Sequence, residues 1–186
     1  MREVKQLSRR EFLAQGTMVA AAGLAVPYLI PRGVLAAPGK PGANERVTVG
    51  VIGTGHRCNL LIDQLPAQAQ IASIADCYLT RARDTAGRRK ANWRVHQDYR
   101  KLLDEKDLDA VIVGTPDHGR VLPCIKACQA GKDIYAEKPL TVCIAEGRAL
   151  VNAVRKHARI CQVGTQQRSM AMNRIACEFI RSGKLG

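Results

Sequence analysis

Two glycines follow the first apolar run of the chain and could bind the phosphates of a nucleotide. Residues 46–58 read RVTVGVIGTGHRC, in which a short strand pattern leads into Gly53 and Gly55. Gly53 permits a tight turn from strand to helix, and Gly55 lets N–H groups at a helix N-terminus approach a pyrophosphate. An ordinary glycine-rich loop is the alternative for this pattern in isolation. The candidate cofactor-binding residues of the turn are Gly53, Thr54, Gly55, His56 and Arg57.

A carboxylate follows this turn at the spacing of a dinucleotide-binding unit. Asp76 ends a second apolar run, 71–76, roughly 20 residues past the turn, where a carboxylate accepts hydrogen bonds from the adenosine ribose. Because a carboxylate repels a 2′-phosphate, the pattern favours NAD, with NADP possible. Three arginines keep NADP open, since each could offset the repulsion, although such arginines usually form a solvated helix face. They are Arg57, Arg81 and Arg83.

The third position of the glycine fingerprint is Cys58 instead of Gly or Ala. That position normally lets the helix pack closely on the strand. A thiol there predicts that the helix lies slightly farther out, and cofactor affinity is the property this would affect.

Three further apolar runs also end in polar residues. Taken singly, each motif has a simpler explanation, such as a capped turn or a surface charge pair beside a helix stop. Taken together, they predict one crevice, because ligands of parallel sheets lie beyond the carboxyl ends of the strands. The motifs are Thr115-Pro116-Asp117-His118, Glu137-Lys138-Pro139 and Gly164-Thr165-Gln166-Gln167-Arg168.

The elements that position these residues alternate between strand and helix. Continuous apolar runs predict strands buried on both faces, and the stretches between them have helical periodicity. This order predicts a doubly wound, parallel α/β sheet of the Rossmann type. The expected strands are 46–52, 71–76, 108–114, 133–138 and 159–163, and the expected helices end near 90 or span 98–107, 119–130, 143–157 and about 169–182.

Composition argues against a nucleic-acid partner despite a formal net charge of +13 over 186 residues. The basic residues form no dense run, and only 4% of residues are aromatic, which leaves few side chains for base stacking. Seven cysteines would permit disulfides in an oxidising compartment. Their spacing lacks paired CxxC motifs, so we expect small apolar core residues and no metal site.

The N-terminus resembles a twin-arginine export signal. Ser8-Arg9-Arg10-Glu11-Phe12-Leu13 precedes a moderately apolar stretch, 18–30, and small residues end at Ala37. A membrane anchor is the alternative, but this stretch is shorter than the ~20 residues needed to span a bilayer. We therefore expect a signal at 1–37, a linker at 38–45, and a periplasmic or other extracytoplasmic location.

Four motifs are similar to those of the glucose-fructose oxidoreductase, inositol dehydrogenase and MocA (Gfo/Idh/MocA) family. They are VGVIGTG, DAVIVGTPDH, GKDIYAEKPL and VGTQQRS, and the resemblance covers nearly all of 46–186. It implies a nicotinamide-binding domain at 46–168 and a helix at 169–186 that leads into a second α/β domain. It also implies hydride transfer between the nicotinamide and a sugar, cyclitol or related alcohol, and homo-oligomers of the full-length protein.

The resemblance assigns roles to individual residues. Lys138 would be the catalytic residue, beside the nicotinamide and the substrate hydroxyl, where its ammonium polarises the oxygen or moves a proton. Glu137 would anchor the cofactor, and the Lys138–Pro139 bond would be cis. The cofactor-binding residues expected after the later strands are Thr115, Pro116, His118, Glu137, Lys138 and Gln166, with a helix cap as the alternative for His118.

Two departures from the family leave other functions open. Gly119 and Arg120 stand where many exported relatives have an aromatic residue and a histidine, so nicotinamide and substrate contacts would differ. The sequence stops at what resembles the point where relatives enter the second domain, so we expect the catalytic histidine that this domain usually carries to lie outside the given sequence. The alternatives are an NAD-dependent glycoside hydrolase of the same fold and a non-catalytic nucleotide-binding module.

Overall fold

The computed structural model describes residues 34–37 and 41–185. The twin-arginine motif and its apolar stretch lie outside the described residues. In the expected linker, residues 43–45 form a 3₁₀ turn, η1 (Ala43–Glu45). No helix in the described ranges is long and apolar enough to cross a membrane.

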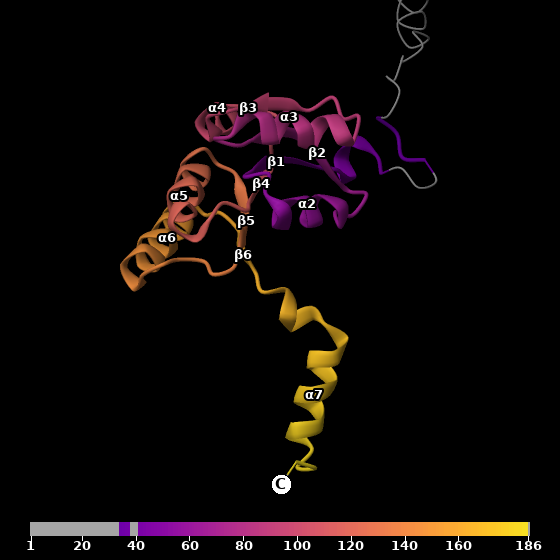
Figure 1. The fold of residues 1–186 in the computed structure, drawn as a ribbon, viewed down its shortest axis with the longest axis vertical. Coiled ribbons are helices and arrows are strands. Elements are labelled where there is room, and N and C mark those ends of the chain that lie inside the picture. Colours follow the sequence, from indigo (N-terminus) through magenta and orange to yellow (C-terminus); the bar gives the residue numbers. More distant parts are fainter. Residues whose placement is uncertain (1–33, 38–40, 186) are drawn as a thin grey trace, which may run out of the picture.

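Six parallel strands form one sheet in the order β3-β2-β1-β4-β5-β6 (Figure 1). This order reverses direction at β1, where the chain crosses from one half of the sheet to the other, as in a doubly wound fold. The predicted Rossmann-type parallel sheet is therefore confirmed. The strands are β1 (Val47–Ile52), β2 (Ala69–Ala75), β3 (Arg94–His96), β4 (Ala110–Val113), β5 (Asp133–Glu137) and β6 (Cys161–Gly164).

Helices cover both faces of the sheet, which explains why the strands are apolar without alternation. One buried cluster joins β1 and β4 to α4, α5 and α6 through residues such as Ile52, Leu102 and Leu150. The opposite cluster joins the same strands to α2 and α3 through residues such as Val51 and Ala82. The helices are α2 (His56–Asp63), α3 (Leu79–Arg88), α4 (Tyr99–Leu103), α5 (Val121–Gln129), α6 (Ile144–Lys156) and α7 (Ala171–Arg181).

Two helices are shorter than the sequence pattern predicts. The expected helix 98–107 ends at Leu103, because Glu105 turns back to accept hydrogen bonds from Ser73, Arg94 and His96. The expected helix 119–130 begins at Val121 and is preceded by a 3₁₀ turn, η2 (Asp117–Gly119). The motif that contains this turn therefore lies in a loop at the carboxyl end of β4.

Helix α7 extends away from the sheet (Figure 1). A third 3₁₀ turn, η3 (Gln166–Ser169), joins it to β6. Its large apolar side chains are exposed, namely Met172, Ile175, Phe179 and Ile180.

Gly114, at the end of β4, makes room for Cys58 on α2. A Cβ built on Gly114 would lie 2.4 Å from the Sγ of Cys58, closer than any real contact allows. Cys58 is fully buried there, and burial, with the nearby carboxylates of Glu137 and Asp76, raises the pKa of its thiol to about 12. Gly114, at the end of the facing strand β4, thus provides the space that the thiol of Cys58 needs. This is how α2 accommodates a thiol at the third fingerprint position.

We expect Gly114→Ala to lower the free energy of unfolding by about 1–3 kcal/mol, because the new methyl group overlaps the thiol. Cys58→Gly removes the overlap, although glycine within a helix itself costs about 1 kcal/mol. Urea denaturation of the four members of this double-mutant cycle measures the coupling. The double variant should be more stable than the sum of the single effects by about 1–2 kcal/mol, and strict additivity would contradict the contact.

Candidate functional site

A cavity of about 820 Å³ opens beyond the carboxyl ends of β1, β2, β4 and β5. Almost every catalytic or cofactor-binding residue predicted from the sequence lines it, although the residues come from five separate segments. These residues are Gly53, Gly55, His56, Arg57, Asp76, Thr115, Pro116, His118, Glu137, Lys138 and Gln166. The exception is Thr54, whose side chain is buried behind the wall.

The glycine turn has the geometry that phosphate binding needs. Gly53 has a φ of +86°, and a Cβ on it would lie 3.0 Å from the backbone nitrogen of Thr115, so a side chain is excluded twice. Gly55 caps α2, and nothing lies within 4 Å of the Cβ position on it. The first N–H groups of α2, which have no partner within the helix, therefore begin next to open space. This end of the cavity suits a pyrophosphate.

Asp76 holds the glycine turn in place through hydrogen bonds from one backbone and one side-chain group of the turn. Its Oδ2 accepts hydrogen bonds from the backbone N–H and the hydroxyl of Thr54, both at 2.8 Å, and its Oδ1 accepts one from the N–H of Tyr78 at 2.9 Å. Thr54 therefore contributes to the site indirectly, by holding the carboxylate of Asp76 in position. A carboxylate has about four acceptor positions. Oδ2 also meets the Nη1 of Arg81 at 3.5 Å, so a ribose hydroxyl would bind at Oδ1, where it competes only with a long contact of 3.8 Å from the Sγ of Cys77.

Burial raises the pKa of Asp76, but the hydrogen bonds from Thr54 and Tyr78 and the nearby Arg81 outweigh burial and hold the pKa below its usual value. A carboxylate with a lowered pKa stabilises the fold above the pKa of the unfolded chain, and this contribution is lost as the pH falls through the folded pKa. We therefore expect the wild-type protein to lose stability below about pH 4 more steeply than Asp76→Asn. Urea denaturation at several pH values checks this, and parallel profiles would contradict it.

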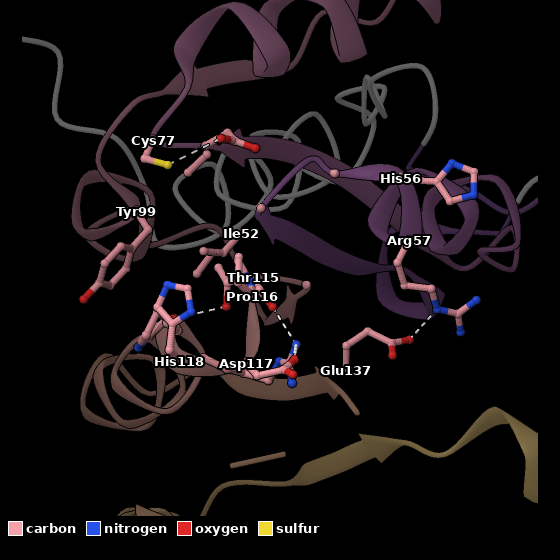
Figure 2. A pocket seen from close by; sticks show the side chains of 18 of the residues that line it. Ile52, His56, Arg57, Cys77, Tyr99, Thr115, Pro116, Asp117, His118 and Glu137 are labelled. Carbon is pink, nitrogen blue, oxygen red and sulfur yellow. Dashed lines mark hydrogen bonds and ion pairs between the residues drawn. The ribbon is translucent and has the colours of Figure 1, made fainter. Parts of the chain in front are cut away.

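The three arginines that left NADP open lie in different places. Arg81 is 3.5 Å from the Oδ2 of Asp76 and lines the cavity. Arg57 instead donates from Nε to the Oε1 of Glu137 at 2.7 Å, and this pair lies across the cavity from Cys77, the residue next to Asp76 (Figure 2). Arg83 is exposed on α3 and is not part of the cavity wall. Of the three, Arg81 is the one placed to meet a 2′-phosphate.

Lys138 lies on the cavity wall at the end of β5. Glu137, which is buried, accepts the backbone N–H of Lys138 at 3.0 Å on Oε2 while its Oε1 binds Arg57. The Lys138–Pro139 bond is cis, as the family resemblance implied. The side chain of Lys138 is exposed. A lysine held in this way can present an ammonium to a ligand in the cavity.

Two buried polar atoms of the wall have no hydrogen-bond partner among the described residues. They are the Oε1 of Gln166 and the Nε of Arg120. A buried acceptor or donor without a partner costs free energy, so each of these atoms needs a partner that the described residues do not supply. The Gln166 oxygen suits an amide N–H of the kind that a nicotinamide carboxamide carries, which fits the predicted cofactor.

Sequence reasoning missed several residues of the wall. Gln97 and Tyr99 follow β3, whose short pattern predicts only a connecting segment, so the sequence gives no reason to expect ligand contacts at its end. Cys77 directly follows Asp76, and its carbonyl accepts a hydrogen bond from Gln97 at 3.0 Å. Arg120 was noted only as a departure from the family. A rule that treats every strand end alike would have found the first three.

The arrangement defines a class of protein. A doubly wound parallel sheet, a glycine turn at a helix N-terminus and a carboxylate after β2 together make a dinucleotide-binding domain of the Rossmann type. Within the described residues, no cluster of three His, Cys, Asp or Glu could hold a metal ion.

The family model of oxidoreductases with an NAD-binding Rossmann fold, Gfo/Idh/MocA, matches residues 47–165. The chain belongs to this family. It is 33% identical over 140 residues to the scyllo-inositol 2-dehydrogenase (NAD(+)) of Bacillus subtilis (strain 168), which covers 74% of this chain and 40% of the relative. The chain thus spans about two fifths of the length of this relative.

Solved structures share the fold. Scyllo-inositol dehydrogenase from Lactobacillus casei, with bound NAD(H) and scyllo-inositol, superposes with a TM-score of 0.67 at 21% identity, covering 76% of this chain and 42% of that one. KijD10, a 3-ketoreductase from Actinomadura kijaniata in complex with TDP-benzene and NADP, gives 0.67 at 24% identity, covering 74% and 44%. These neighbours show the fold. The predicted cofactor class, a nicotinamide dinucleotide, is confirmed by the family, whose model describes an NAD-binding Rossmann domain.

Proposed function

We propose that this chain is the nucleotide-binding part of an oxidoreductase that transfers a hydride between a nicotinamide and a sugar, cyclitol or related alcohol. The observation that carries the proposal is the cavity itself. Its wall contains the glycine turn after β1 and Asp76 after β2, together with Lys138 after β5. Membership of the family and the 33% identity to a scyllo-inositol 2-dehydrogenase support the choice of substrate class.

Four residues of the wall then have roles in this reaction. The turn at Gly53 and Gly55 binds the pyrophosphate, and Asp76 accepts hydrogen bonds from the adenosine ribose. When bound, the nicotinamide supplies the hydride acceptor or donor. Lys138 holds its ammonium at the reacting oxygen of the substrate, where it stabilises developing negative charge and moves the proton.

The test uses the longest native polypeptide that carries this sequence, with NAD and one of three probes, scyllo-inositol, myo-inositol or D-glucose. Net NADH formation, followed by absorbance, is the expected result. Hydrolysis of p-nitrophenyl glucosides without net NADH would favour the glycoside hydrolase instead. NADH binding with neither reaction, on these probes or a wider set of sugars, would favour a binding module.

We propose that the protein is exported in folded form by the twin-arginine route, which would carry the bound cofactor with it. The support is the motif around Arg9 and Arg10, in a part of the chain that the structure does not describe. Replacing both arginines by lysine should retain the precursor in the cytoplasm, as shown by cell fractionation. Unchanged extracytoplasmic delivery would contradict the route.

We further propose that the full-length protein forms homo-oligomers. The support is the family resemblance rather than the apolar face of α7, on which Met172 is 73% and Ile175 57% exposed, because this face lies where the second domain is expected to follow and to cover it. Sedimentation of the native protein tests this. A single monomeric species at micromolar concentration would contradict the proposal.

A further inference from the structure

Arg120 is a buried cation on the wall of the cavity. Its side chain is 4% exposed, and it stands between the 3₁₀ turn η2 and helix α5. A buried guanidinium is stable only if hydrogen bonds replace the water that it has lost. The partners of Arg120 therefore indicate what it does.

The strongest of these partners belong to two different loops. One terminal nitrogen of Arg120, Nη2, donates to the carbonyl of Thr115 at 2.6 Å, and the other, Nη1, donates to the carbonyl of Pro139. Nη2 also meets the carboxylate of Asp117 at 3.1 Å, but Asp117 is 54% exposed, so solvent weakens that ion pair. Arg120 thus joins the loop after β4 to the loop after β5.

The backbone does not make this connection itself. The pairing of β4 with β5 ends at Val113 and Ala136, before either loop begins. Pro139 lacks an N–H and so has no donor of its own. Beyond the last paired residues of β4 and β5, the guanidinium of Arg120 supplies the hydrogen bonds that strand pairing no longer makes.

Lys138 lies directly between two such attachments. Glu137, on its N-terminal side, binds Arg57 and the N–H of Lys138. Pro139, on its C-terminal side, is bound by Arg120. The backbone of Lys138 is therefore held from both sides, while its side chain remains exposed to the cavity.

We propose that Arg120 is a positioning residue, which fixes the backbone of Lys138 against the Thr115 wall of the cavity. The inference rests on the proposed function, in which Lys138 meets the reacting oxygen. Misplacing a catalytic group by about 1 Å costs on the order of 10²-fold in rate. Removing the guanidinium should therefore affect turnover far more than cofactor binding.

A purely structural role for Arg120 makes a different prediction. The side chain makes no capping hydrogen bond to α5, so the helix does not need it to begin. Lysine preserves the charge and most of the length but has a single nitrogen, which cannot span two carbonyls as a planar fork does. Arg120→Lys thus keeps the positive charge but loses the pair of hydrogen bonds that joins Thr115 to Pro139.

The experiment compares Arg120→Lys, Arg120→Ala and, as a control, Arg155→Ala, which removes an exposed arginine of α6 outside the cavity. Each is made in the longest native polypeptide. Three quantities are measured: NADH affinity, kcat with NAD and scyllo-inositol, and hydrogen–deuterium exchange of the segment 137–142. Thermal melting reports whether each variant folds.

We expect exchange in 137–142 to rise at least about tenfold in Arg120→Ala and by less in Arg120→Lys, with the preceding residues of β5 unchanged. NADH affinity should stay within about threefold of wild type, whereas kcat falls about 10²-fold and is partly restored by added guanidinium. Arg155→Ala should match wild type throughout.

Unchanged exchange in both Arg120 variants would overturn the proposal, whether or not scyllo-inositol is turned over. Equal losses of NADH affinity and kcat, or melting before 37 °C in Arg120→Ala with a wild-type Arg120→Lys, would also overturn it, because they indicate a structural role. Failure of the proposed function is distinct, since it would appear as no net NADH formation by the wild-type polypeptide, while exchange in 137–142 still reports whether Arg120 holds this segment.

Discussion

Lys138→Ala should abolish hydride transfer while leaving the fold and NADH affinity almost unchanged. A residue that handles a proton in the transition state contributes about 10²–10⁴-fold to the rate. The side chain of Lys138 is exposed on the cavity wall, and its backbone is held by Glu137 rather than by its own ammonium. Removing the side chain of Lys138 therefore takes away the ammonium but none of the hydrogen bonds that hold the fold at this position.

The measurement is kcat and NADH affinity of Lys138→Ala in the longest native polypeptide. Lys126→Ala is the matched control, because Lys126 is exposed on α5 and lies away from the cavity. Lys126→Ala should retain wild-type turnover. If Lys138→Ala retains it as well, the catalytic role is wrong; if it loses NADH affinity in parallel, Lys138 contributes to binding and not to chemistry.

Asp76→Ser should reverse the preference between the two cofactors. Loss of the carboxylate removes hydrogen bonds to the ribose and should weaken NADH binding about 10–100-fold. It also removes the repulsion of a 2′-phosphate, which Arg81, 3.5 Å from the carboxylate, is then free to bind. We expect the ratio of NADPH to NADH affinity to rise at least about 10²-fold.

Titration of both cofactors into Asp76→Ser and Asp76→Ser/Arg81→Ala measures this. The second variant should lose the gain in NADPH affinity. Asp84→Ser is the control, because Asp84 is exposed on α3 outside the cavity and should leave both affinities unaltered. An unchanged ratio in Asp76→Ser would show that the carboxylate serves only to hold Thr54.

The residues that sequence reasoning placed correctly in the cavity are those whose position follows from topology. Gly53, Asp76 and Lys138 each end a strand of a parallel sheet, and such ends meet at one edge whatever the details of packing. Their convergence on one cavity follows from strand order and needs no knowledge of side-chain contacts.

The residues that were missed depend on contacts that no spacing encodes. The bond from Arg120 to Pro139 joins residues on two loops, and its existence depends on how far each loop extends beyond its strand. Gly114 makes room for Cys58 because two elements that are distant in sequence meet there. Local patterns predict elements, but contacts between elements require the assembled fold.

Titration of NADH tests the central claim, that the cavity is a dinucleotide site, most directly. The native polypeptide is compared with Gly55→Glu and Gly87→Glu, two glycines at which a Cβ meets nothing within 4 Å, so both variants should fold. We expect saturable one-to-one binding to the native protein and to Gly87→Glu, whose side chain lies at an exposed position of α3, and none to Gly55→Glu, whose carboxylate occupies the pyrophosphate position. Equal binding by a folded Gly55→Glu, or none by the native protein, would contradict it.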